Sequence, residues 1–193
     1  MAGAFRSKRL IYQPLDTNDK DKVWFFKLES EPVGTGQADG SVFLPHRKEE
    51  MDKRLESIVT KSIVAVKMCL PKPTVDIEQG EDKETASTSP EDSVVVPLGF
   101  ISIGGHGMSQ PNVLDGMIAI RVLEEYTGKG YGSEAINWAV DWSFRFGNFH
   151  RISMGCFTYN LRAVKLYEKL DFVVEGRIRQ AGISTGNGMM RLD

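Results

Sequence analysis

Apolar positions along the chain follow two different periods, and their order predicts a mixed α/β domain. Intervals of three and four, which place apolar side chains on one helix face, occur over residues 19–29, 46–61, 132–146 and 161–170. Residues 9–15 alternate loosely, as in a short strand. Further segments typical of strands cover residues 62–70, 94–103, 113–123, 151–158 and 172–180, and the first three of these are rich in β-branched residues. Strands and helices that follow one another in this way are typical of the mixed α/β class.

The periodicity also predicts which side chains form the core. In the first helix, expected to begin at Thr17 or Asp19, the core candidates are Val23, Trp24, Phe25 and Phe26. In the helix over 46–61, the expected inward residues are Met51, Leu55, Ile58 and Val59. In the helix over 132–146, they are Ala135, Ile136, Ala139, Val140 and Ser143.

An acidic segment interrupts this pattern. Residues 76–92 contain seven acids and one Lys, with Ser, Thr, Gly and Pro between them. Such a composition buries too little apolar area to offset its ordering entropy, which predicts a flexible acidic loop at 72–93 within a single domain of residues 1–193. The loop is interpreted as a tolerated insertion, with an attractor for a cationic partner or a phosphorylation site at residues 87–90 as alternatives.

Composition narrows the class of protein. The net charge of −2, from 24 basic and 26 acidic residues, argues against nucleic acid as a partner. No apolar run approaches the length of a membrane span, and the first residues lack the apolar core of a secretory signal, so a cytoplasmic protein is expected. Cys69 and Cys156 are expected to be buried thiols, and no His or Cys has ligand spacing, which predicts no metal site.

A glycine-rich turn between a strand and a helix carries the first chemical signal. Residues 127–132 read Thr-Gly-Lys-Gly-Tyr-Gly, directly after a β-branched run. Glycines there allow a tight turn and present backbone N–H groups at a helix N-terminus, an arrangement that suits a phosphate or pyrophosphate, with Lys129 adding a charge. The spacing fits neither the dinucleotide fingerprint nor the phosphate-binding loop of NTPases.

A second signal lies in the helix that follows. Asn160 is a good N-cap, and Tyr167 lies about two turns further on, so both project from nearly the same face with the small Ala163 between them.

Together the two segments resemble the GNAT superfamily of acetyl-CoA-dependent N-acetyltransferases, nearest the branch of ribosomal-protein N-terminal and spermidine acetyltransferases. The family's Gln/Arg-x-x-Gly-x-Gly/Ala loop is matched at residues 127–132, with Thr127 in place of Gln or Arg. Its Asn-x-x-Ala-x-x-x-Tyr-x-x-x-Gly-Phe helix is matched at Asn160, Ala163, Tyr167 and Phe172, with Asp171 in place of Gly. The resemblance implies a mostly antiparallel sheet that splays at the cofactor strand.

The resemblance also implies roles for individual residues toward acetyl-CoA. The pantetheine arm would pair with the backbone of Ile120 and Val122, Asn160 would bind a pantetheine amide, and a backbone N–H near Val122 would stabilise the charge on the carbonyl oxygen. Tyr167 would be the general acid that protonates the departing thiolate. The cofactor's phosphates would lie against Thr127, Gly128, Lys129, Gly130, Tyr131, Gly132 and Ser133.

Several alternatives stay open at this point. The acceptor is a protein N-terminus, a polyamine or a small-molecule amine, and the base is Asp115, Glu124, Glu125, His106 or a water chain, since Met117 stands where relatives place a Glu. Residues 189–193 suffice only for a stub of the family's last strand, so either the substrate site is open or a second subunit of a homodimer completes it. A non-catalytic acyl-CoA-binding regulatory module is the rival function.

Overall fold

The computed structural model describes residues 3–31, 46–71, 95–105, 115–178 and 189–192. The predicted acidic loop at 72–93 and His106 lie outside these residues. The helices are α1 (Asp19–Glu29), α3 (Lys48–Lys61), α4 (Tyr131–Arg145) and α5 (Leu161–Lys169), with a 3₁₀ turn, η1 (Glu124–Tyr126). The strands are β1 (Ile11–Pro14), β2 (Ser62–Pro71), β3 (Val95–Gly105), β4 (Asp115–Val122), β5 (Arg151–Phe157), β6 (Gly176–Ile178) and β7 (Met189–Leu192).

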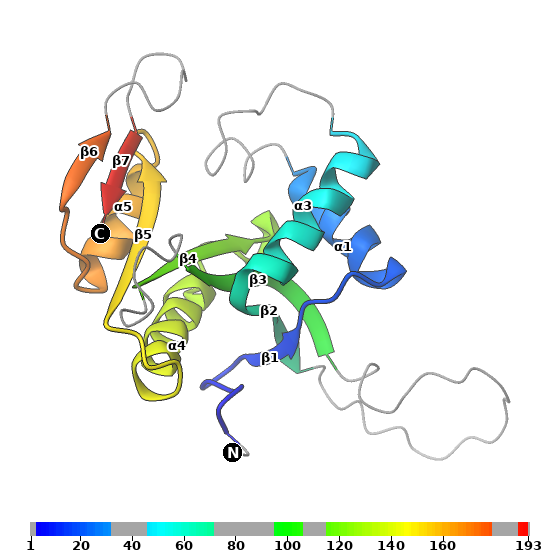
Figure 1. Ribbon diagram of the computed structural model, residues 1–193, viewed down its shortest axis with the longest axis horizontal. Coiled ribbons are helices and arrows are strands. Elements are labelled where there is room, and N and C mark those ends of the chain that lie inside the picture. The colour runs from blue at the N-terminus through cyan, green and yellow to red at the C-terminus, as the bar shows by residue number, and fades with distance from the viewer. Residues whose placement is uncertain (1–2, 32–45, 72–94, 106–114, 179–188, 193) are drawn as a thin grey trace, which may run out of the picture.

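These strands form one sheet in the order β1-β2-β3-β4-β5-β7-β6 (Figure 1). Every neighbouring pair is antiparallel except β4 and β5, which are parallel. The predicted mixed sheet, mostly antiparallel, is therefore confirmed. The expected strand over 172–180 is shorter than predicted, since β6 begins only at Gly176.

Helices cover both faces of the sheet. The α4 and α5 face buries side chains such as Ile136 and Tyr167 against Ile101 and Ile118. The opposite face buries Phe25 of α1 and Leu55 of α3 against sheet residues such as Phe100. Because side chains alternate along a strand, β2 and β3 supply residues to both layers. The two strands pair with each other, as predicted.

Helix α1 differs in detail from its prediction. Its N-cap is Asn18, whose Oδ1 accepts the Asp21 N–H at 2.9 Å. Val23, an expected core residue, is 63% exposed, whereas Phe25 and Leu28 are fully buried. The inward face of α1 contains residues 21, 25 and 28, at intervals of four and three. The run of apolar residues from Val23 to Phe26 made this face hard to identify from the sequence.

The N-terminal segment, residues 3–10, lies beside α4. The Tyr12 ring of β1 stacks on Trp138 of α4 with centroids 3.7 Å apart. The Trp138 Nε1–H donates to the Ala4 carbonyl at 2.8 Å. Trp138 therefore belongs to the core, although the periodicity of α4 did not single it out.

Two findings from composition can be compared with the structure. Cys69 and Cys156 are buried free thiols, as predicted. Among the described residues, no helix combines the length and the apolarity needed to cross a bilayer.

Candidate functional site

One edge of β4 exposes backbone groups at its C-terminal half. The Leu123 N–H donates to the Leu98 carbonyl at 2.8 Å, and Ile120 lies opposite Ile101 in an antiparallel register. In such a ladder alternate residues direct their N–H and C=O groups to the same neighbour. Leu123 faces β3, so the polar backbone groups of Ile120 and Val122 point the other way, toward β5.

Strand β5 does not reach those groups. The parallel pairing of β4 with β5 runs from Asp115 opposite Arg151 to Ile118 opposite Met154 and ends there, although both strands continue. Figure 1 shows the two strands diverging beyond this join. The splayed sheet that the resemblance implied is therefore present, and it leaves Ile120 and Val122 next to a site where an extended amide chain could pair.

The glycine turn follows directly, between η1 and α4. Gly128 and Gly130 have φ values of 78° and 81°, a left-handed conformation that favours glycine. The first bond of the helical ladder is donated by the Glu134 N–H to the Gly130 carbonyl at 3.2 Å. Within the described part of the chain, the N–H groups from Gly128 to Ser133 have no hydrogen-bond acceptor. This set of donors at a helix N-terminus suits a phosphate group.

Thr127 faces away from that set of donors. Its N–H and its hydroxyl both donate to the Glu124 carbonyl, at 3.0 Å and 2.8 Å. The side chain at the position of the family's Gln or Arg thus closes the η1 turn.

A cluster of polar residues fixes the first turn of α4. The Glu134 carboxylate accepts hydrogen bonds from the Ser7 hydroxyl at 2.7 Å and from the Arg9 N–H at 2.6 Å, and it pairs with Arg9 Nε at 2.7 Å. Arg9 Nη1 also donates to the Lys129 carbonyl at 3.0 Å, and its guanidinium lies 4.5 Å from the centre of the Tyr131 ring. This Ser7–Arg9–Glu134 cluster holds the glycine turn to the N-terminal segment.

Electrostatics within this cluster favour an ionised carboxylate. Burial alone would raise the pKa of Glu134, but hydrogen bonds from Ser7 and Arg9 and the Arg9 charge outweigh it and lower the pKa. Sequence reasoning missed this cluster because Arg9 and Glu134 are far apart in the chain.

Helix α5 supplies the two predicted side chains. Asn160 is its N-cap, as predicted, and its Oδ1 accepts the Ala163 N–H at 3.1 Å. Tyr167 is buried, with its ring centroid 6.2 Å from that of Phe172. Burial raises the pKa of Tyr167 well above its usual range, and the neighbouring Cys156 adds to the rise. The phenol therefore stays protonated and can act as a proton donor.

The predicted base candidates are scattered. Asp115, at the start of β4, lies 4.0 Å from the guanidinium of Arg151. Glu124 and Glu125 are exposed in η1. Asp115 lies at the start of β4, whereas Glu124 and Glu125 follow the end of this strand at Val122. The structure therefore does not bring the three carboxylates together.

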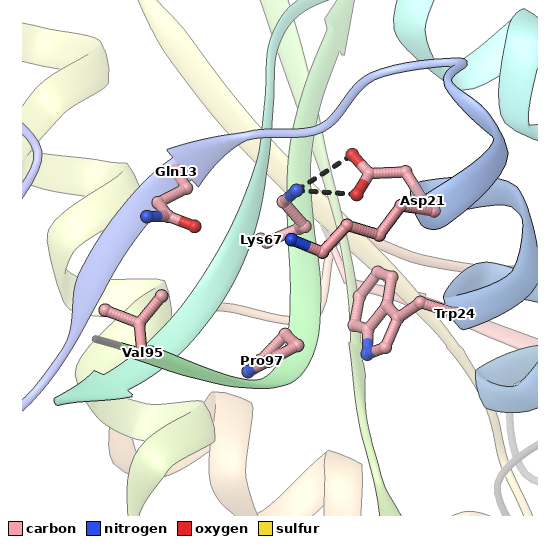
Figure 2. Close-up of a pocket in the computed structure, with 7 residues that line it drawn as sticks. Gln13, Asp21, Trp24, Lys67, Val95 and Pro97 are labelled. Atoms are coloured by element: carbon pink, nitrogen blue, oxygen red, sulfur yellow. Dashed lines mark hydrogen bonds and ion pairs between the residues drawn. The ribbon is translucent and has the colours of Figure 1, made fainter. Parts of the chain in front are cut away.

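A separate pocket lies on the opposite face, between α1 and the strands β1 to β3. Figure 2 shows Asp21 and Lys67 facing one another in it, and Lys67 Nζ lies 2.7 Å from Asp21 Oδ1. The two charges compensate each other, and the ion pair links α1, which carries Asp21, to β2, which carries Lys67. The lining residues are Gln13, Lys20, Asp21, Trp24, Lys67, Val95 and Pro97.

Among the described residues, no group of three or more His, Cys, Asp or Glu side chains could hold a metal ion.

Comparison with known proteins identifies relatives of this chain. Residues 74–172 match the model of the GNAT family of acetyltransferases. A spermidine N(1)-acetyltransferase of Vibrio cholerae is 41% identical over 59 residues, which cover 31% of this chain and 34% of the relative. The chain thus spans about a third of the length of this curated relative.

Solved structures share the fold over nearly the whole chain. A Vibrio cholerae spermidine N-acetyltransferase, in complex with CoA and spermine, has a TM-score of 0.65 at 19% identity and covers 95% of this chain and 92% of its own. A ribosomal L7/L12 alpha-N-protein acetyltransferase in complex with CoA has a TM-score of 0.68 at 14% identity, covering 97% and 94%. A Salmonella typhimurium acetyltransferase with acetyl-CoA has a TM-score of 0.64 at 16% identity, covering 96% and 91%.

Proposed function

Because the chain belongs to the GNAT family of acetyltransferases, we propose that it transfers the acetyl group of acetyl-CoA to a primary amine. The observation that carries this proposal is the continuity of the β4 edge at Ile120 and Val122, with which no described strand pairs, with the N–H groups of the glycine turn. An extended chain of amides that ends in a pyrophosphate has the chemistry to occupy both.

The residues present fit such a ligand. The pantetheine amides would pair with Ile120 and Val122 as an added strand, since those backbone groups point away from β3. The pyrophosphate would accept hydrogen bonds from the N–H groups of Gly128–Ser133 at the positive end of α4. Asn160, which caps α5 through its Oδ1, would bind a pantetheine amide, as the resemblance implied.

The proposed reaction is a direct transfer. The nitrogen of a neutral amine attacks the thioester carbonyl, a carbon–nitrogen bond forms and the carbon–sulfur bond breaks. A backbone N–H near Val122 would stabilise the charge on the carbonyl oxygen. Tyr167 would give its phenolic proton to the leaving thiolate, and the proton released by the amine would restore the phenol through solvent. Tyr167 carries its proton at neutral pH, since even an unperturbed phenol has a pKa of about 10 and burial raises the pKa of Tyr167 further.

Cationic amines are the acceptor class that we favour. Proteins similar to this chain are named spermidine N(1)-acetyltransferase and ribosomal L7/L12 alpha-N-protein acetyltransferase. The slight net negative charge of this protein is compatible with attraction of a cationic amine.

Two measurements test the proposal. Titration calorimetry with acetyl-CoA and with desulfo-CoA should show binding of both ligands. Release of thiol from acetyl-CoA should then depend on an added amine, tested with spermidine, spermine and a peptide with a free N-terminus. Binding without acetylation of any amine would instead support the rival function, a non-catalytic acyl-CoA-binding module.

The Tyr167→Phe variant isolates the general acid. It removes the hydroxyl but keeps the ring that packs against Phe172. Turnover should fall about 10²-fold or more, within the range of general acid catalysis, while the affinity for acetyl-CoA stays within about twofold. An unchanged rate would refute the role given to Tyr167, and Tyr126→Phe in the η1 turn is the matched control.

A further inference from the structure

Two guanidinium groups from distant parts of the chain flank the glycine turn. Arg9 Nη2 lies 3.4 Å from the position that a Cβ atom on Gly130 would take. Arg162 Nη2, from the first turn of α5, lies 3.4 Å from the equivalent position on Gly128. An arginine therefore lies beside each of the two glycines, Gly128 and Gly130.

The two arginines differ in what they contact. Arg9 is neutralised by Glu134, with its Nε 2.7 Å from Oε2. Arg162 is exposed, and within the described ranges it has no carboxylate partner. Its charge therefore remains available to a ligand.

The surroundings of Arg162 are unfavourable for a cation when no anion is bound. The side chain belongs to the first turn of α5, at the positive end of that helix, and it lies beside the glycine turn that precedes α4. Lys129 adds another positive charge to the same turn. An anion placed between the two helix starts would relieve this repulsion.

Thr127 supplies no side-chain donor to that place. Its hydroxyl donates to the Glu124 carbonyl at 2.8 Å, inside the η1 turn. A cationic side chain that contacts a ligand beside Gly128 must therefore come from another part of the chain. Arg162 lies at that position.

We propose that Arg162 binds the pyrophosphate of acetyl-CoA beside Gly128, and thereby replaces the side-chain contact that Thr127 does not make. This inference rests on the proposed function and adds a binding residue to the same site. Guanidinium suits the task because its fork of N–H donors matches two phosphate oxygens.

The test compares Arg162→Gln with Lys165→Gln, a matched control that removes one exposed charge from the same helix. Calorimetric titrations use CoA and 3′-dephospho-CoA, which share the pyrophosphate but differ in the ribose phosphate. Arg162→Gln should weaken both ligands by the same factor, about tenfold, as expected for one charge-assisted hydrogen bond. Lys165→Gln should leave both affinities within about twofold, because an exposed charge without a close partner contributes little.

Kinetics supply a second readout for the same variants. Arg162→Gln should raise the KM for acetyl-CoA and leave kcat unchanged, since the pyrophosphate contact is the same in the ground state and the transition state. Introducing Thr127→Arg into the Arg162→Gln variant should recover affinity for both ligands.

The outcomes separate the two proposals. A loss of affinity for CoA that disappears with 3′-dephospho-CoA would place Arg162 on the ribose phosphate and overturn the inference. Unchanged affinity in Arg162→Gln, with normal binding by the unmodified protein, would also overturn it while the proposed function stands. Absence of CoA binding by the unmodified protein would refute the proposed function, and this inference with it.

Discussion

Two tyrosines hold their protons far more tightly in the folded protein than in water. Burial raises the pKa of Tyr167, with a smaller contribution from Cys156. Burial likewise raises the pKa of Tyr12, although its hydrogen bond to Ser7 opposes the rise. Both rings are in the core, so ionising either phenol would place a charge where water cannot solvate it.

This predicts a loss of stability at alkaline pH. In the unfolded chain both phenols ionise near pH 10, whereas in the folded protein they stay protonated to higher pH. Above about pH 10 the unfolded state therefore binds fewer protons, and the free energy of unfolding falls as pH rises. Urea denaturation at pH 8 and at pH 11 should show a smaller fall for a Tyr12→Phe/Tyr167→Phe variant than for the unmodified protein. Equal falls would contradict the assignment.

Single residues were predictable where a local rule fixed them. Asp171 has a φ of 65°, the conformation that its replacement of a family glycine required. Asn160 caps α5, as an Asn before a helical pattern predicts. Arg162 carried no comparable signal, because its significance depends on a turn more than thirty residues earlier. The cofactor contacts of the site residues stay predictions.

At the scale of an element, α4 depends on one carboxylate in its first turn. Glu134 binds Ser7 and Arg9 of the N-terminal segment and lies at the positive end of the helix. A negative charge there is favourable to the helix dipole as well as to Arg9.

Replacing Glu134 by Gln should lower the free energy of unfolding by about 1 kcal/mol at neutral pH, a modest figure because the Arg9 side chain is 42% exposed. The lowered pKa of Glu134 stabilises the fold above the ordinary pKa of about 4.3, and this contribution is lost as pH falls through the folded pKa. The difference between the two proteins should therefore shrink in acid, as measured by urea denaturation at pH 7 and pH 3.

Asp141→Asn is the control for that comparison. Asp141 pairs with Arg145 one turn along α4 at 2.6 Å, but both side chains are exposed. Its loss should change stability by no more than about 0.5 kcal/mol. A larger effect from Asp141→Asn than from Glu134→Gln would contradict the role of the Ser7–Arg9–Glu134 cluster.

Periodicity predicted each helix but not every face. The inward residues Met51 and Leu55 of α3 were expected and are buried. Trp138 of α4 was missed, because it packs against Tyr12 and the N-terminal segment at the side of the helix. The periodicity of apolar residues identifies the main apolar face of a helix. A second face can be buried by a segment that is distant in the chain, and the periodicity does not show this.

At the scale of the whole molecule, a buried ionic cluster joins the sheet to the helices on one face. Arg121 of β4 donates from Nη2 to the Leu28 carbonyl at 3.1 Å and lies 3.5 Å from Glu29 of α1. Glu29 is 1% exposed and also lies 3.4 Å from Arg54 of α3. One carboxylate thus connects β4, α1 and α3.

Arg121→Met should be severely destabilising, by about 3 kcal/mol, since it leaves the buried Glu29 with less compensation. Adding Glu29→Gln should recover part of that loss, because the double variant no longer buries a charge. Denaturation of the two single variants and the double variant measures the coupling. Strict additivity of the three values would show that the two residues do not act as a pair.

The order of elements followed from the sequence, but the order of strands in the sheet did not. Segments of alternating period predicted the succession of strands and helices, and the resemblance implied the splay at β4. The position of β7 between β5 and β6 was not predicted, since four residues carry too short a pattern to specify a partner. Strand pairing depends on contacts between distant segments, which a local period does not encode.

The short join between β4 and β5 has a consequence for folding cooperativity. Among the residues that the structure describes, four register pairs link the β1–β4 part of the sheet to the β5–β7 part. A ligand that contacts both the β4 edge and α5 would act as a reversible cross-link between them, and its binding free energy would add to the cost of separating them. Amide hydrogen exchange in β5 should then slow more on ligand binding than exchange in β2. The cofactor would in this way determine how far the two parts unfold as one unit.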